Sequence, residues 1–164
     1  MSDNKNTSFA SLPEEKQEAI KNFISGTAEN IMKMTPEQKK SMAQISYKAL
    51  EPELRGIKVE DFKCTSYYEF LCQIVLAAAF VDKDFALEEE KVLDDIMETI
   101  GLFGQPFAED IEKINKTEFD LSELSGKLKP ESRGMFATFI ALIFMGDNEL
   151  VEDEYNMMIN ILAP

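Results

Sequence analysis

Apolar residues recur at the three- and four-residue spacing of α-helices along most of the chain. The first such stripe consists of Ile20, Phe23, Ile24, Ala28 and Ile31. It predicts an amphipathic helix capped by Ser11, with Pro13 in its first turn. The next start signal, Thr35-Pro36-Glu37-Gln38, has the residues of a capping box and predicts a helix that runs to about Leu50 and ends before Pro52.

The same spacing continues to the end of the sequence. It predicts helices from Ser66 to about Val81, Leu87 to Ile100, Pro106 to about Asn115, Pro130 to Met145 and Val151 to Leu162, with a further turn or two capped by Asp120. No segment shows the alternation typical of a strand. The fold expected is all-α: a single-domain bundle of seven or eight helices over residues 11–164, with N-terminal helices over 11–63 and a flexible polar tail over 1–10.

The longest apolar runs cover about twelve residues, fewer than the roughly twenty that a membrane-spanning helix needs. The first residues, Met1 to Asn6, are polar and do not resemble a secretory signal. With 45% apolar and 29% charged residues among 164, the composition is that of a globular protein. We therefore expect a cytoplasmic protein without direct membrane insertion.

The net charge of −14 is confined to one part of the chain. Residues 1–63 contain ten acidic and ten basic side chains, whereas residues 64–164 contain 21 acidic and seven basic ones. Nucleic acids and anionic membranes bind clustered lysine and arginine, so neither is an expected partner. A cation or a basic protein partner fits this charge.

The sequence has no histidine and only two cysteines, Cys64 and Cys72. Histidine-based acid–base catalysis and zinc sites of the cysteine–histidine type are therefore excluded. Cys72 lies within an apolar helix and is predicted to fill the core. Any bound metal must have oxygen ligands, which favours Ca²⁺, Mg²⁺ or Mn²⁺.

An acidic pattern recurs at an offset of 65 residues. In each copy an apolar helix ends at an Asp, an acid follows two residues later, and a Glu follows seven residues later at the start of an amphipathic helix. The candidate ligands of a divalent cation are Asp82, Asp84 and Glu89 in the first copy and Asp147, Glu149 and Glu154 in the second. The repeat predicts two helix–elbow–helix hairpins, over 66–102 and 130–164, related by approximate two-fold symmetry.

Glu89 and Glu154 fall on the apolar stripes of their helices, where an uncompensated charge costs several kcal/mol. Three partners can compensate it. The glutamate can accept hydrogen bonds from backbone N–H groups at the helix start, pair with a lysine such as Lys83 or Lys91, or bind a cation with its neighbouring acids. The elbows are not EF-hands, because the sixth and twelfth positions of each loop lack the required Gly and Glu.

The elbows resemble the signature of the TerB-like family, which includes the tellurite-resistance protein TerB and the N-terminal region of the DjlA co-chaperone. That signature is an apolar helix, Ala-Asp-Gly-x-(Ile/Leu)-x-x-x-Glu, and an amphipathic helix; here the copies begin Val81-Asp82 and Gly146-Asp147. The resemblance covers about residues 66–164 and implies a non-enzymatic helical bundle with cation-binding acids. Lys83 and Asn148 replace the family's Gly, which makes the second elbow the better candidate, because Asn tolerates a left-handed backbone and Lys does so less readily.

These observations lead to one main hypothesis and two alternatives. The main one is a non-enzymatic module that binds a divalent cation and a protein partner, in stress or envelope response. The first alternative is a helical interaction adaptor without metal, whose acids serve solubility or attract a basic partner. The second is a metal hydrolase that uses both acidic elbows as a two-metal site.

Overall fold

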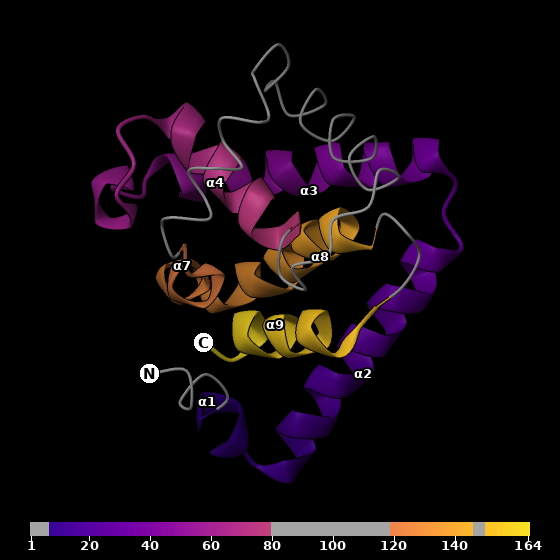
Figure 1. Cartoon of the computed structure of the whole chain (residues 1–164). Helices are drawn as coiled ribbons and strands as arrows, with labels where there is room; N and C mark the ends of the chain where they lie inside the picture. Colours follow the sequence, from indigo (N-terminus) through magenta and orange to yellow (C-terminus); the bar gives the residue numbers. More distant parts are fainter. Residues whose placement is uncertain (1–6, 80–118, 146–149) are drawn as a thin grey trace.

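The computed structural model describes residues 7–79, 119–145 and 150–164 (Figure 1). Every regular element in these ranges is helical, which confirms the predicted all-α class. The α-helices are α1 (Thr7–Ala10), α2 (Glu14–Met32), α3 (Pro36–Arg55), α4 (Tyr67–Ala79), α7 (Leu121–Lys127), α8 (Arg133–Phe144) and α9 (Glu152–Leu162), and the 3₁₀ turns are η2 (Val59–Phe62) and η3 (Pro130–Ser132). The predicted helices over 87–100 and 106–115 lie outside the described residues, so the total of seven or eight helices and the paired hairpins stay predictions.

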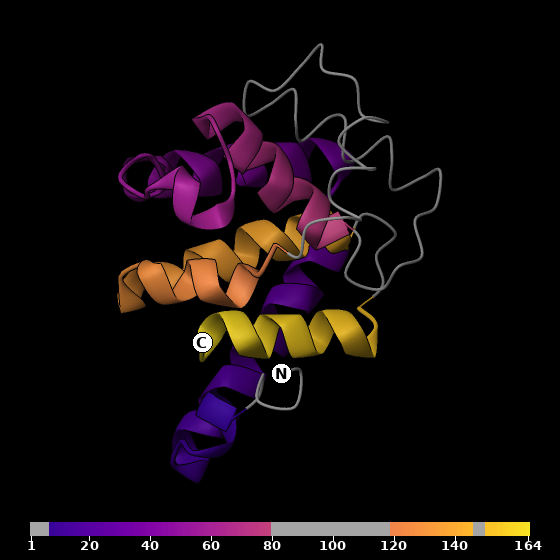
Figure 2. The same ribbon diagram turned by 60° about the vertical axis from the view of Figure 1, so that its left-hand side comes forward.

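Helix α8 lies at the centre of the bundle. Figures 1 and 2 show it between α3 and α4 on one side and α9 on the other, with α2 crossing the stack diagonally. It packs against α2, α3, α4 and α9. The side chains of Phe136, Phe139 and Ile140 are at most 1% exposed. Because each such side chain contributes about 1.5–3 kcal/mol on burial, α8 supplies a large share of the core.

The middle of helix α4 is buried around its whole circumference. The six consecutive residues from Leu71 to Leu76 are all buried, including Cys72 at 3% exposure and Gln73 at 5%. A helix with one solvated face would instead alternate buried and exposed residues every three or four positions. The continuous apolar run therefore reflects complete burial, and the prediction that Cys72 fills the core is confirmed.

The N-terminal segment differs from its prediction in three details. Helix α2 begins at Glu14 with Pro13 at its cap and no side-chain cap hydrogen bond, so Ser11 does not cap it. Phe23, expected on the buried stripe, is 39% exposed, while Ile24 is fully buried. Residues Thr7–Ala10, within the predicted tail, form the single turn α1, which packs against α9.

Helix α3 starts as predicted and ends later. Gln38 N–H donates to the Thr35 hydroxyl, and the Gln38 side chain accepts from Thr35 N–H, which confirms the capping box. The prediction that the helix ends before Pro52 is wrong, because α3 continues to Arg55.

Two contacts account for the extra turn of α3. Leu54 is 1% exposed, and the N–H of Lys129 donates to a Glu53 carboxylate oxygen at 2.9 Å. A proline inside a helix removes one hydrogen bond and clashes with the preceding turn, at a cost of about 3 kcal/mol. Pro52 is exposed, so its turn faces solvent. Burial of Leu54 and the long-range bond offset the cost.

Two serine hydroxyls of α7 donate hydrogen bonds to backbone carbonyls at the C-terminal end of α9. Ser122 Oγ donates to the carbonyl of Asn160 at 3.1 Å, and Ser125 Oγ donates to the carbonyl of Ile161. The last four carbonyls of a helix have no partner within it. The N-terminus of α7 is itself capped by Asp120, whose Oδ1 accepts from the N–H groups of Ser122 and Glu123, as predicted. These bonds fix α7 against α9.

An aromatic corner connects η2 to α4. The rings of Phe62, Phe70 and Phe119 lie 5.4–6.0 Å apart between centroids, within the range of favourable aromatic pairs. The chain leaves η2 through Lys63, whose φ of 61° is left-handed. This conformation suits glycine and is strained for lysine.

Candidate functional site

The structure places one of the six predicted cation ligands. Helix α8 ends at Phe144 and α9 begins at Glu152, so the second acidic elbow falls between them. Glu154 lies in the first turn of α9. The other five candidates, Asp82, Asp84, Glu89, Asp147 and Glu149, lie outside the described residues. Glu154 is therefore the residue from which this candidate site is built.

Glu154 lies on the buried face of α9, as its spacing predicts. It is 4% exposed, and Met158 and Ile161 on the same face are fully buried. One carboxylate oxygen, Oε1, accepts a hydrogen bond of 3.1 Å from the N–H of Val151, the residue at the helix cap. In a full capping box the side chain of the cap residue also accepts a hydrogen bond from the N–H of the third helical residue, here Glu154. The Val151 side chain has no acceptor, so only one half of the capping box is present.

The start of α9 is electrostatically suited to a carboxylate. Helix N-termini carry partial positive charge, and Glu152, Asp153 and Glu154 all lie in the first turn. A hydrogen bond to an ionised group contributes about 1.5–3 kcal/mol. Such a bond offsets part of the several kcal/mol that burying the charge costs. Backbone capping, the first of the three predicted partners of Glu154, is therefore present.

A deprotonated glutamate has two oxygens and about four acceptor positions, and the bond from Val151 uses one of them. Within residues 7–79, 119–145 and 150–164, no three acidic or cysteine side chains lie close enough together to hold a metal ion. A cation site at this elbow thus needs ligands from outside these ranges, and Asp147 and Glu149 are the predicted ones.

A second polar cluster, not identified from the sequence, joins α3 to α4. Tyr47 lies at its centre: its hydroxyl is 3.2 Å from a Glu51 carboxylate oxygen and 3.0 Å from the Tyr67 hydroxyl. Arg55 donates to the same Glu51 oxygen from Nε and from a terminal nitrogen, and its guanidinium lies 4.3 Å from the centre of the Tyr67 ring. The spacing of Tyr47, Glu51 and Arg55 at four-residue intervals was the available signal. No sequence signal linked Tyr67 to this cluster, because it lies twenty residues after Tyr47.

The cluster keeps its phenols protonated. Burial raises the pKa of Tyr67, and its hydrogen bond with Tyr47 raises it further. Burial also raises the pKa of Tyr47. The hydrogen bond from Arg55 lowers the pKa of Glu51. The cluster connects α3 to α4 through the hydrogen bond between the two tyrosines and the contact of the Arg55 guanidinium with the Tyr67 ring.

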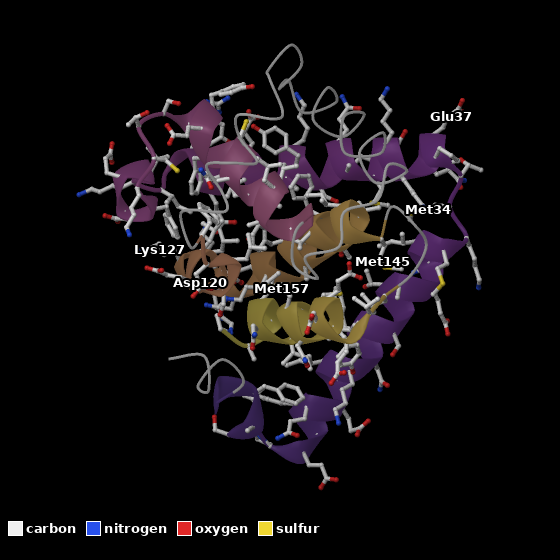
Figure 3. All side chains as sticks on the ribbon, viewed as in Figure 1. Met34, Glu37, Asp120, Lys127, Met145 and Met157 are labelled. Carbon is white, nitrogen blue, oxygen red and sulfur yellow. The ribbon has the colours of Figure 1, made fainter. Side chains whose placement is uncertain are left out.

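A groove opens at the α2–α3 elbow, on the outside of the bundle. It has a volume of about 800 Å³. Its lining consists of Asn30, Lys33, Met34, Thr35, Glu37, Gln38, Ser41, Met42 and Ile45. Ile45 is 58% exposed, and Met32 beside the elbow is 46% exposed. Figure 3 shows Met34 and Glu37 at this elbow, at the opposite end of the molecule from Asp120 and Lys127 on α7.

Comparison with protein-family models, curated proteins and solved structures finds no significant match for this chain. The resemblance to the TerB-like family therefore rests on the elbow pattern alone. No helix within the described ranges has the length and apolar content needed to cross a membrane.

Proposed function

We propose that the chain is a non-enzymatic, TerB-like helical module that binds a divalent cation at the elbow between α8 and α9 and also binds a protein partner. The carboxylates of Asp147, Glu149 and Glu154 supply the cation ligands. The observation that carries this proposal is the burial of Glu154 to 4% exposure at the start of α9, directly after the elbow in sequence. A buried carboxylate is retained where a hydrogen bond, an opposite charge or a metal compensates it.

A second candidate is the same module without metal. The hydrogen bond from Val151 N–H to Glu154 favours it, because capping gives the buried carboxylate a structural role. In that case the acids keep the chain in solution or attract a basic partner, and binding weakens as salt is added.

The two candidates differ in the response to Glu154→Gln. The Gln carbonyl oxygen can still accept from Val151 N–H, so the cap is retained while the negative charge is lost. The measurement is the unfolding temperature of each protein with added Ca²⁺, Mg²⁺ or Mn²⁺, together with calorimetric titration. If the cation binds, it raises the unfolding temperature of the parent protein and not that of Glu154→Gln or Asp147→Asn, because binding to the native state alone is stabilising.

The matched control is Asp120→Asn on α7. It removes one negative charge from another helix cap, and Asn caps helices as well as Asp does. Its response to cations should equal that of the parent protein. Cation stabilisation that is the same in all four proteins would exclude the elbow as the binding site and leave the metal-free module.

A further inference from the structure

Three methionines gather at the α2–α3 elbow. Met32 is the last residue of α2, Met34 lies in the connection to α3 (Figure 3), and Met42 lies within α3. Met34 and Met42 line the groove and also pack against the hydrophobic core. Met145 and Met158, by contrast, are fully buried. Met34 and Met42 therefore combine access from solvent with a part in the packing of the bundle.

A thioether that solvent can reach reacts with peroxides. The sulfur lone pair attacks one oxygen of hydrogen peroxide, the O–O bond breaks, an S=O bond forms, and the second oxygen leaves as water. Sulfur loses the two electrons that the peroxide gains, so the reaction needs no other reactant. A groove of about 800 Å³ admits a molecule as small as hydrogen peroxide to the two sulfurs. Methionine sulfoxide reductases convert the product back to methionine.

The sulfoxide oxygen changes the surroundings that suit these side chains. Against apolar core side chains, a polar oxygen without a hydrogen bond costs free energy. The lining of the groove offers donors instead: the amide of Asn30, the ammonium group of Lys33 and the hydroxyl of Ser41. An oxidised Met34 or Met42 is therefore more stable when it turns from the core toward the groove, and the elbow then loses that part of its packing.

We propose that Met34 and Met42 form a reversible oxidation site with a peroxide as the oxidant, and that their oxidation loosens the α2–α3 elbow from the core. Met32 and Met135 also react, because they are 46% and 37% exposed. Their sulfoxides point into water, which supplies the hydrogen bonds, so their oxidation leaves the stability of the protein unchanged. The partly buried pair is thus the one whose modification changes the structure.

Treatment with increasing hydrogen peroxide, followed by peptide mass mapping, measures the oxidation rate of each methionine. Met34 and Met42 should react at least about tenfold faster than the fully buried Met145 and Met158. The unfolding temperature of the oxidised protein should be lower by about 2–8 °C, because polar oxygens have replaced apolar contacts with the core. Repair with methionine sulfoxide reductases should restore the original temperature.

The double variant Met34→Leu/Met42→Leu removes both sulfurs and nearly conserves side-chain volume, so it should fold and keep its unfolding temperature after peroxide treatment. The matched control, Met32→Leu/Met135→Leu, should lose as much as the parent protein. Three results overturn the proposal: oxidation of Met34 and Met42 no faster than that of the buried methionines, an oxidised parent protein that melts at its original temperature, or equal losses in the two double variants. The first two measurements use the parent protein alone and do not depend on the folding of any variant.

Discussion

Replacing Ser125 by Ala tests the attachment of α7 to α9. Ser125 is fully buried, and its hydroxyl donates to the carbonyl of Ile161, which is also fully buried. Ala removes the donor and leaves a buried acceptor with one partner fewer, at a cost of about 1–3 kcal/mol. For a chain of this length each kcal/mol changes the unfolding temperature by about 2–4 °C. The expected decrease is therefore about 4–8 °C at a central cost of 2 kcal/mol.

The control is Ser122→Ala, three residues earlier on the same helix. Ser122 makes a comparable bond to the carbonyl of Asn160 and is only half-buried, so water can replace its hydroxyl. Both substitutions replace serine by alanine in the same helix, so most of the change in helix propensity cancels in the comparison. Urea denaturation and thermal melting give the two free energies of unfolding. If Ser125→Ala destabilises the protein no more than Ser122→Ala, the buried bond is not a main source of stability.

Three further predictions concern the backbone and the tyrosine cluster. Gly26→Ala within α2 should raise the free energy of unfolding by about 0.8–1 kcal/mol in urea denaturation, because an added Cβ meets no atom within 4 Å and alanine favours helix. Lys63→Gly should stabilise the protein by up to about 1 kcal/mol in the same assay, because relief of left-handed strain at φ 61° (about 1–2 kcal/mol) exceeds the entropy that glycine adds to the unfolded chain (about 0.4–1 kcal/mol); a net destabilisation would contradict that balance. The raised pKa of Tyr67 contributes stability that is complete below its unfolded value of 10.0 and is lost as pH rises toward its higher folded value. Unfolding temperatures measured above pH 10 should therefore fall less steeply in Tyr67→Phe than in the parent protein.

Three signals that act within a few residues predicted their structures correctly, although the expected cap at Ser11 and the expected burial of Phe23 did not hold. The capping box at Thr35 and Gln38 needs only residues three apart, and so does the cap formed by Asp120. The inward direction of Glu154 followed from helical spacing relative to Met158. In the two caps the atoms that interact are neighbours in sequence, and for Glu154 the helical period alone sets the face, so local spacing determines each outcome.

Features that depend on distant residues could not be predicted in this way. Helix α3 passes through Pro52 because Leu54 is buried and Glu53 binds Lys129, a residue 76 positions later. The partner of Tyr47 in its cluster is Tyr67 on another helix. A proline indicates a helix end from its own geometry, and nothing in the local sequence shows that long-range contacts offset its cost. The candidate cation ligands other than Glu154 lie outside the described residues, so cation binding at the elbow stays a prediction.

The central position of α8 has a consequence for the order of folding during synthesis. Helices α2, α3 and α4 pack against α8, which begins at Arg133, and α2 also packs against α9 near the end of the chain. Ribosomes add about 5–20 residues per second, so the N-terminal helices emerge several seconds before their shared partner. During that interval the apolar residues of α4 lack the α8 surface against which they pack, and the nascent chain is expected to need protection from aggregation until α8 emerges.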